Sequence, residues 1–364
     1  EPSQVVGPDG AADLEIINSG IAYNQAISLY NYVNSLREGT QRQVALQSIT
    51  GLTGVQPEGV DVLYSVSQGQ GVTTYYYIEE IAPIQGSGDL ADGEQIVVSG
   101  HSLGGHLAAI ASALFPELVS GVYTYNAPGY GGITQEAIHQ ITGIYVVLKL
   151  HEKIIHSLVG ESEFGGDDYD AISDLRTPFS SQESIFIEVN TNGDAGLAGH
   201  SKVQIADSLK LYDVFSTLDP SLTSAEIGAF LHFGSNEAAN SLESITTALA
   251  EFFDIADSQI PEYVDADNLS ARNKYHEVIS AIKGNAFYQL LSGSASISSV
   301  PTNIASLAAE NTQAGRGYRY SLVNLLPFVI TGDLTGTVAD DVVYDLYDGN
   351  GDRQYTDQYF KDRA

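Results

Sequence analysis

The segment EQIVVSGHSLGGHLAAIASALFPELV, residues 94–119, constrains the fold of this chain more than any other. A short apolar run leads into Gly-His-Ser-Leu-Gly, and a run of small apolar residues follows. This order predicts a buried strand, a sharp turn at Ser102 and a helix over residues 103–115 that Pro116 ends. Such a turn lifts the serine hydroxyl clear of the sheet and sets a helix N-terminus beside it.

The surrounding segments predict a parallel sheet that is covered by helices. Residues 15–37 and 135–141 show helical periodicity, and apolar runs typical of strands stand at residues 121–125, 143–150 and 184–189. Alternation of this kind indicates the α/β class, and with the serine turn we expect an α/β-hydrolase fold with a mostly parallel sheet. Between these elements, residues 38–93 predict some strand or mobile surface, and residues 161–182 an acidic, irregular excursion.

The second half of the chain is predicted to be mostly helical. Helical patterns run near residues 201–218, 223–233, 236–255, 266–283 and 303–312. We therefore expect residues 1–220 to form the α/β-hydrolase core and residues 221–364 to form a helical extension that packs on it or caps it. The later helices are amphipathic with acidic polar positions, which favours core packing over a membrane face.

Composition excludes several function classes. The 364 residues carry 46 acidic and 15 basic side chains, a formal charge of −31, whereas nucleic-acid binding needs a surplus of Lys and Arg. Cysteine is absent, which excludes disulfides and thiolate metal sites. The apolar run at residues 107–115 is shorter than the roughly 20 residues that span a bilayer. No basic-then-apolar leader opens the chain, and its first residue is Glu1, so we expect a processed or excised piece.

Ser102 is the predicted nucleophile, and it needs a histidine as its base. The base of such an enzyme follows a later strand, with the acid between the two in sequence. His200 fits this order best, because it follows the run at residues 184–189 and precedes a helix. The remaining histidines fit less well. Histidines beside the serine or on predicted helices are expected to have packing or surface roles: His101, His106, His139, His232 and His276. His151 and His156 come too early in the chain for an acid to stand between them and Ser102.

The acid holds the imidazole in the right tautomer and is expected at the end of the intervening strand. Glu152 follows the predicted strand at residues 143–150 and stands midway between Ser102 and His200. Asp167, Asp168 and Asp170, in the acidic excursion, remain alternatives.

The oxyanion of an acyl-transfer intermediate needs two donors. The N–H of Leu103 is one by position. The second normally comes from a loop after an earlier strand; no such strand is evident, and the donor is expected near residues 7–11 or outside this chain.

These motifs resemble those of a known group of enzymes. VVSGHSLGGHLAAIASALFP resembles the nucleophile elbow of bacterial lipases of the α/β-hydrolase superfamily. HSKVQIADSLKLYDVFSTLDPSL, from His200, resembles the histidine segment of lipase-like modules in large secreted RTX-type calcium-binding proteins. SNEAANSLE, YRYSLVNLLPF and DQYFKDRA are similar to later parts of those modules, so the resemblance covers most of the chain from residue 13 onward.

The resemblance implies a serine esterase or lipase, secreted by a bacterium, that acts on lipid or phospholipid esters with transient contact to a lipid surface. Ser102 and His200 carry over directly. Glu152 carries over less directly, because LKLHEKIIHSLVG lacks the usual lipase aspartate pattern, and the glycine-aspartate repeats of RTX proteins are missing. No cofactor is needed for catalysis, and Ca²⁺ enters only as a structural ion. DGNGD at residues 348–352 is better explained as a polar turn than as a calcium loop. Two alternatives stay open: a catalytically silent module of a large adhesion or toxin protein, and a serine acyltransferase or polyester depolymerase.

Overall fold

The computed structural model describes residues 16, 21–129, 135–143, 154–161, 177–188, 200, 202–234, 241–255, 269–310 and 312–334. The chain divides into two compact units. The first contains residues 1–159 and 169–183, and the second contains residues 160–168 and 184–364. The domain boundary expected at residue 220 stays a prediction.

A four-stranded sheet with the order β4-β5-β6-β7 carries the Ser102 segment. Its strands are β4 (Ile96–His101), β5 (Val119–Tyr125), β6 (Ile155–Glu161) and β7 (Gln182–Phe186). The pairs β4–β5 and β5–β6 are parallel. Helix α3 (Leu103–Leu114) follows β4 and packs on β4 and β5 through buried small side chains such as Ala108 and Ala109. The described chain therefore has the mixed α/β architecture that the sequence predicts.

The strand after α4 (Gln135–Thr142) differs from the expected one. Residues 144–150 of the predicted strand lie outside the described residues. The strand that pairs with β5 is β6, which begins at Ile155 and ends at Glu161. The sequence analysis assigns Glu161 to the irregular excursion, but this residue closes a sheet strand, so the excursion cannot begin before residue 162.

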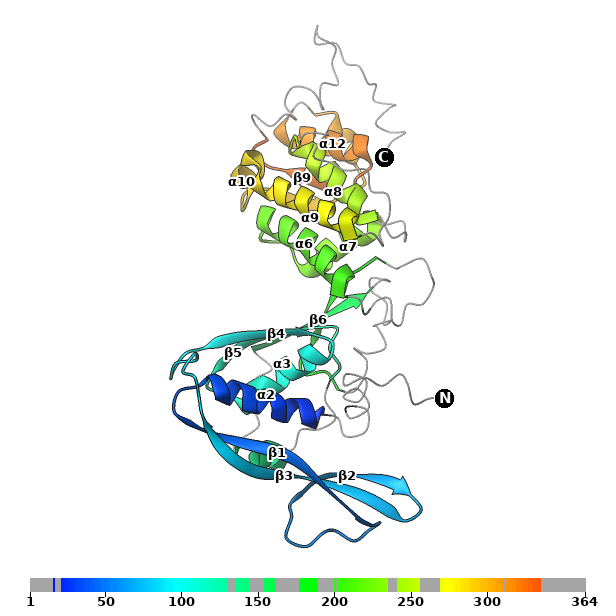
Figure 1. Cartoon of the computed structure of the whole chain (residues 1–364). Helices are drawn as coiled ribbons and strands as arrows, with labels where there is room; N and C mark the ends of the chain where they lie inside the picture. The colour runs from blue at the N-terminus through cyan, green and yellow to red at the C-terminus, as the bar shows by residue number, and fades with distance from the viewer. Residues whose placement is uncertain are drawn as a thin grey trace. The chain divides into compact units, whose positions relative to one another are not determined.

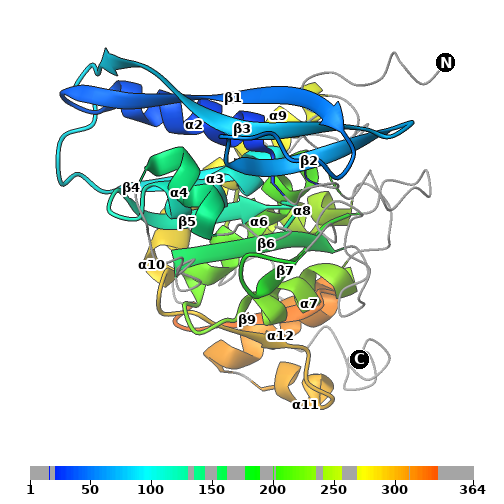
Figure 2. The same cartoon turned by 90° about the horizontal axis from the view of Figure 1, so that it is seen from below.

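A second sheet lies within residues 38–93, for which the sequence analysis predicts only some strand or mobile surface. Strands β1 (Thr40–Leu52), β2 (Val62–Gly69) and β3 (Val72–Gln85) pair antiparallel in the order β1-β3-β2. Figures 1 and 2 show α2 (Tyr23–Leu36) and α3 between this sheet and the parallel one, and α2 contacts both β1 and α3. Helix α2 confirms the C-terminal two thirds of the helix predicted over residues 15–37.

Helix α2 is joined to β1 by side-chain amides that bond to the strand's outer edge. The Asn31 amide donates to the carbonyl oxygen of Val44 (2.7 Å), and its oxygen accepts the N–H of Val44 (3.0 Å). The Asn34 amide donates to the carbonyl oxygen of Arg42 (3.0 Å). A stack of tyrosines adds to this contact: Tyr23 lies on Tyr64, and Tyr64 on Tyr76. The amide contacts satisfy backbone N–H and C=O groups that an edge strand otherwise leaves open.

The second unit is mostly helical, as predicted. Its helices are α6 (Lys202–Leu218), α7 (Ser224–Gly234), α8 (Ser241–Phe252), α9 (Leu269–Gly284), α10 (Ala286–Leu291), α11 (Ile304–Ala308) and α12 (Gln313–Asn324). Strands β8 (Ser296–Ser299) and β9 (Phe328–Thr331) pair antiparallel. The single helix expected at residues 303–312 is wrong, because Thr312 caps α12 by accepting the N–H of Gly315 (2.9 Å) and so separates α11 from α12.

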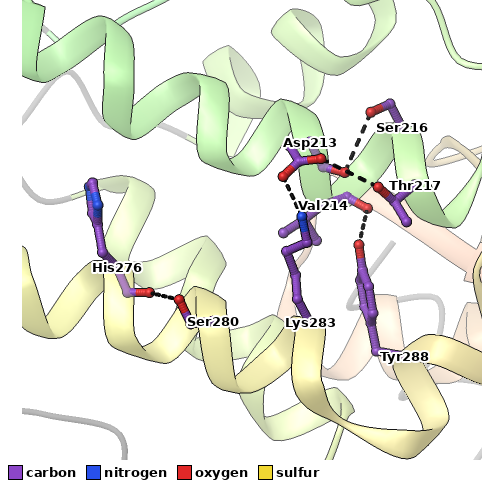
Figure 3. A network of polar contacts seen from close by, with 8 residues as sticks. All are labelled: Asp213, Val214, Ser216, Thr217, His276, Ser280, Lys283 and Tyr288. Atoms are coloured by element: carbon purple, nitrogen blue, oxygen red, sulfur yellow. Dashed lines mark hydrogen bonds and ion pairs between the residues drawn. The ribbon is translucent and has the colours of Figure 1, made fainter.

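Helix α6 is fixed to its neighbours by the polar contacts in Figure 3. Lys283 of α9 forms an ion pair with Asp213 of α6, and the Tyr288 hydroxyl of α10 donates to the carbonyl oxygen of Val214 (3.1 Å). Beyond the end of α6, the buried Asp219 accepts the N–H of Ile297 (2.8 Å). These bonds set the direction of the helix that begins two residues after His200.

Candidate functional site

Ser102 stands at a strained turn between β4 and α3. Its backbone has φ 56° and ψ −130°, a conformation that costs a non-glycine residue about 1–3 kcal/mol. Hydrogen bonds hold the turn on both sides. The Ser102 N–H donates to the carbonyl oxygen of Tyr125 at the end of β5 (2.9 Å), and the Ser102 carbonyl accepts the N–H groups of Gly105 (2.8 Å) and His106 (3.1 Å). The sharp strand-to-helix turn predicted from the sequence is present.

The hydroxyl of Ser102 is not used to cap the helix. Serine at an N-cap position normally accepts an N–H of the first turn with its side-chain oxygen. Ser102 occupies the N-cap of α3 but makes no side-chain cap bond. An ordinary capping role therefore does not explain this serine, and its hydroxyl is left for another partner.

Glycines allow the backbone to turn this tightly, but they are not the pair that the motif suggests. A Cβ at Gly100 would lie 2.1 Å from the carbonyl oxygen of Gly104, and one at Gly105 would lie 2.6 Å from the Cβ of Ala127. A Cβ at Gly104 would meet nothing within 4 Å. The expectation that both glycines of Gly-His-Ser-Leu-Gly prevent collisions is right for Gly100 and wrong for Gly104, whose place is taken by Gly105.

The N-terminus of α3 presents backbone donors beside the serine. The N–H groups of Leu103 and Gly104 come before the first intrahelical acceptor bonds, which begin with Gly105. Leu103 packs on the buried side chains of Ile16 and Ala22, so the segment that leads into α2 adjoins the turn. Residues 7–11, where a second oxyanion donor was expected, lie outside the described residues.

His106 is a buried connector, in agreement with its predicted hydrogen-bonding role. Its Nδ1 lies 3.2 Å from the carbonyl oxygen of Gly129, after β5, and its Nε2 accepts the N–H of Ala22 (3.5 Å). Its exposure is 0%, and burial lowers its pKa from 6.5 to about 4. The neutral ring thus donates to one loop and accepts from another, which excludes it as the base for Ser102.

The loop after β5 is packed closely at the same edge of the sheet. A Cβ at Gly129 would lie 2.0 Å from the carbonyl oxygen of Thr177, so these two segments touch through their backbones. Below them, the Ser157 hydroxyl of β6 accepts from Thr124 of β5 (3.2 Å) and from Ser180 (3.0 Å). Polar side chains therefore join β5, β6 and the segment at residues 177–180 beneath the turn.

The other histidines have local partners in the described part of the chain. His156 stacks on Tyr123, His232 meets the ring edge of Phe186, and the His276 Nε2 lies 2.7 Å from the Asp207 carboxylate. His139 lies on α4, and His151 lies outside the described residues. His200 is a partly buried turn residue directly before α6. Ser102 belongs to the first unit and His200 to the second, and their pairing stays a prediction.

The predicted acids lie outside the described residues: Glu152, Asp167, Asp168 and Asp170. The sequence analysis missed Glu161, which ends β6 with 2% exposure and a carboxylate oxygen that is buried without a hydrogen-bond partner. A glutamate directly after the apolar run of β6 was the available signal, but that strand was placed too early in the chain.

Two further properties concern ions and membranes. Within the described ranges, no group of three or more His, Cys, Asp or Glu side chains could hold a metal ion, and the DGNGD turn lies outside these ranges. In the same part of the chain, no helix is long and apolar enough to cross a membrane.

Comparison with known proteins yields no match: no protein-family model, curated protein or solved structure is similar to this chain.

We expect the two motif glycines to respond differently to a methyl group. Gly100→Ala forces α3 away from β4 and is expected to lower the free energy of unfolding by about 2 kcal/mol or more. Gly104→Ala is the matched control and should change it by less than about 0.5 kcal/mol, because the site is open and alanine favours helix. Urea unfolding of both variants measures this difference, and equal losses would contradict the geometry of the turn.

His106 should make stability fall in mild acid. The unfolded chain binds a proton near pH 6.5, whereas native His106 stays neutral down to about pH 4, so the free energy of unfolding decreases as the pH falls through this window. The loss amounts to roughly 3 kcal/mol at most. Urea unfolding between pH 7 and 4.5 should give a flatter profile for His106→Gln than for the exposed control His156→Gln; parallel profiles would reject this role.

Proposed function

We propose that the chain is a serine carboxylester hydrolase with an α/β-hydrolase fold, a lipase or esterase that acts on lipid or phospholipid esters. One observation carries the proposal: Ser102 stands at a strained strand-to-helix turn, beside free helix N–H groups, with a hydroxyl that caps nothing. Strain of this kind persists where the surroundings hold it, and it concentrates at functional sites. The resemblance of the Ser102 and His200 segments to bacterial lipase-like modules supports the same reaction, together with secretion and a structural Ca²⁺.

The proposed mechanism uses an acyl-serine intermediate. His200 takes the proton of the Ser102 hydroxyl as the oxygen attacks the ester carbonyl. The N–H of Leu103, with a second donor, stabilises the oxyanion at the positive end of the α3 dipole. His200 then gives its proton to the leaving alcohol. His200 takes a proton from water, which attacks the acyl-serine; the bond to Ser102 breaks, His200 returns the proton to the Ser102 oxygen, and the carboxylic acid leaves. An acid, Glu152 by the sequence analysis, orients His200, and no step requires a metal.

A fluorophosphonate probe tests the proposal directly, because it forms a phosphorus–oxygen bond only with an activated serine and releases fluoride. We expect labelling of the native chain and none for Ser102→Ala. His200→Gln should slow labelling by about 10⁴-fold or more. Ser99→Ala, on the same strand, is the matched control and should label normally.

Mass spectrometry of the labelled peptide locates the adduct. A native chain that stays unlabelled in the presence of calcium would reject the hydrolase proposal and favour the silent module. Acyl transfer to an added alcohol in preference to water would favour the acyltransferase.

The connection between β1 and β2, here called the tip, supports contact with a lipid surface. Leu52 is 69% exposed and Val55 60% exposed at the turn between β1 and β2. Glu58 and Asp61 are the charged residues of the whole stretch 43–78, in a chain that carries −31. An apolar, weakly charged tip on an acidic protein fits the surface of a neutral lipid aggregate. Most of the acidic residues, which anionic headgroups would repel, lie elsewhere in the sequence.

We expect the tip to matter only for aggregated substrate. A Leu52→Ser, Val55→Ser double variant should hydrolyse an emulsified long-chain ester at least about five-fold more slowly, since each buried side chain contributes on the order of 1 kcal/mol. A soluble short-chain ester should be hydrolysed at an unchanged rate. Tyr32→Ser removes an equally exposed side chain, at 62%, from α2 and serves as the control. Equal effects on both esters would reject contact through the tip.

A further inference from the structure

Glu161 has the properties of a carboxylate that awaits a partner. It is the last residue of β6, its exposure is 2%, and its Oε1 atom is buried with no hydrogen-bond partner. A buried polar atom without a hydrogen-bond partner costs about 1–3 kcal/mol, so native proteins rarely keep one without a use. Packing alone therefore does not explain this residue.

Three other carboxylates of the second unit have hydrogen-bond partners. Asp219 accepts from Ser221 and from the N–H of Ile297, and Asp207 contacts His276. Glu188 accepts the N–H of Leu242 at the start of α8 (2.9 Å). Glu161 differs from these three, because its Oε1 atom is buried and has no hydrogen-bond partner.

Hydrogen bonds connect the segment around Glu161 to β7 and α6, the two elements on either side of His200. The Glu161 carbonyl accepts the N–H of Ile187, directly after β7 (3.0 Å). The end of β7 is in turn bound to α6, because the N–H of Phe186 donates to the Tyr212 hydroxyl (3.0 Å). Helix α6 begins at Lys202, directly after the His200 turn. Glu161 and His200 thus belong to the same compact unit, and His200 lies in the connection between β7 and α6.

Strand direction also favours Glu161 over Glu152. The strands β4, β5 and β6 run parallel, and Ser102 follows the carboxyl end of β4. Side chains that cooperate with a residue at that edge come from the carboxyl ends of neighbouring strands. Glu161 is at the carboxyl end of β6, whereas Glu152 precedes the first residue of this strand in sequence.

We propose that Glu161 is the acid that orients His200; this inference rests on the proposed hydrolase function. Its carboxylate accepts the N–H of one imidazole nitrogen, which directs the other nitrogen toward the Ser102 hydroxyl. During attack the proton moves from Ser102 to His200, and the ionised carboxylate stabilises the imidazolium without taking the proton itself. Glu161 is therefore a positioning residue, which acts through His200 and not on the substrate.

The experiment compares Glu161→Gln with Glu152→Gln, the residue favoured by sequence. The rate constant for fluorophosphonate labelling is measured from pH 5 to 9. We expect Glu161→Gln to lower it by about 10³–10⁴-fold, and by far more than Glu152→Gln does. Glu183→Gln, at an exposed glutamate of β7, is the matched control and should stay within about two-fold of the native rate. Loss of the carboxylate removes the stabilisation of the imidazolium, so the acid limb of the remaining rate should shift to lower pH. A structural role alone would not move that limb, and Glu161→Asp should restore part of the rate.

The outcomes separate this inference from the proposed function. If the native chain labels at Ser102 and Glu161→Gln labels equally well, the role of Glu161 is rejected and the hydrolase proposal stands. The same holds if the loss of labelling appears in Glu152→Gln instead. A native chain that does not label overturns both. Circular dichroism verifies folding, and Glu161→Asp provides the readout if the glutamine variant does not fold.

Discussion

The close approach of α3 to β4 is the constraint on which the rest of the site depends. With no Cβ at Gly100 or Gly105, the helix backbone comes near enough to the strand for Ser102 to take a positive φ. That conformation is unfavourable by itself and survives because the Ser102 amide and carbonyl are both bonded, one to β5 and the other to the first turn of α3. The absence of two methyl groups thus permits the strained turn that places Ser102 at the N-terminus of α3.

A second layer of contacts holds the loops around this turn. The neutral ring of His106 lies on α3 and bonds to the segment before α2 and to the loop after β5, so three parts of the first unit meet at one imidazole. The serine and threonine hydroxyls beneath it join β5 to β6. Such contacts contribute little individually, about 1 kcal/mol for a typical hydrogen bond, but they fix the direction in which each strand delivers its loop to the carboxyl edge of the sheet.

The sequence predicted what depends on local pattern and missed what depends on pairing partners. The strand before Ser102, the helix after it and the helices from residue 202 follow from periodicity and caps, which are local. The antiparallel sheet at residues 40–85 was obscured by its glycines and polar residues, because those strands are stabilised by cross-strand tyrosines and by Asn31 of α2. Strand β6 was missed because two apolar runs stand close together, at residues 143–150 and 154–159. Only the pairing with β5 shows that the second run forms the strand. Glu161 was missed with it, since burial of a carboxylate cannot be read from composition.

The amide of Asn31 has a consequence for how copies of this chain behave toward one another. An edge strand with open N–H and C=O groups is a template on which a strand from another molecule can grow. Asn31 occupies both groups of Val44, so a foreign strand that docks on β1 cannot continue its ladder past this residue. The formal charge of −31 adds long-range repulsion between copies at low salt. One side chain on a neighbouring helix thereby limits edge-to-edge aggregation through β1, an edge strand of the antiparallel sheet.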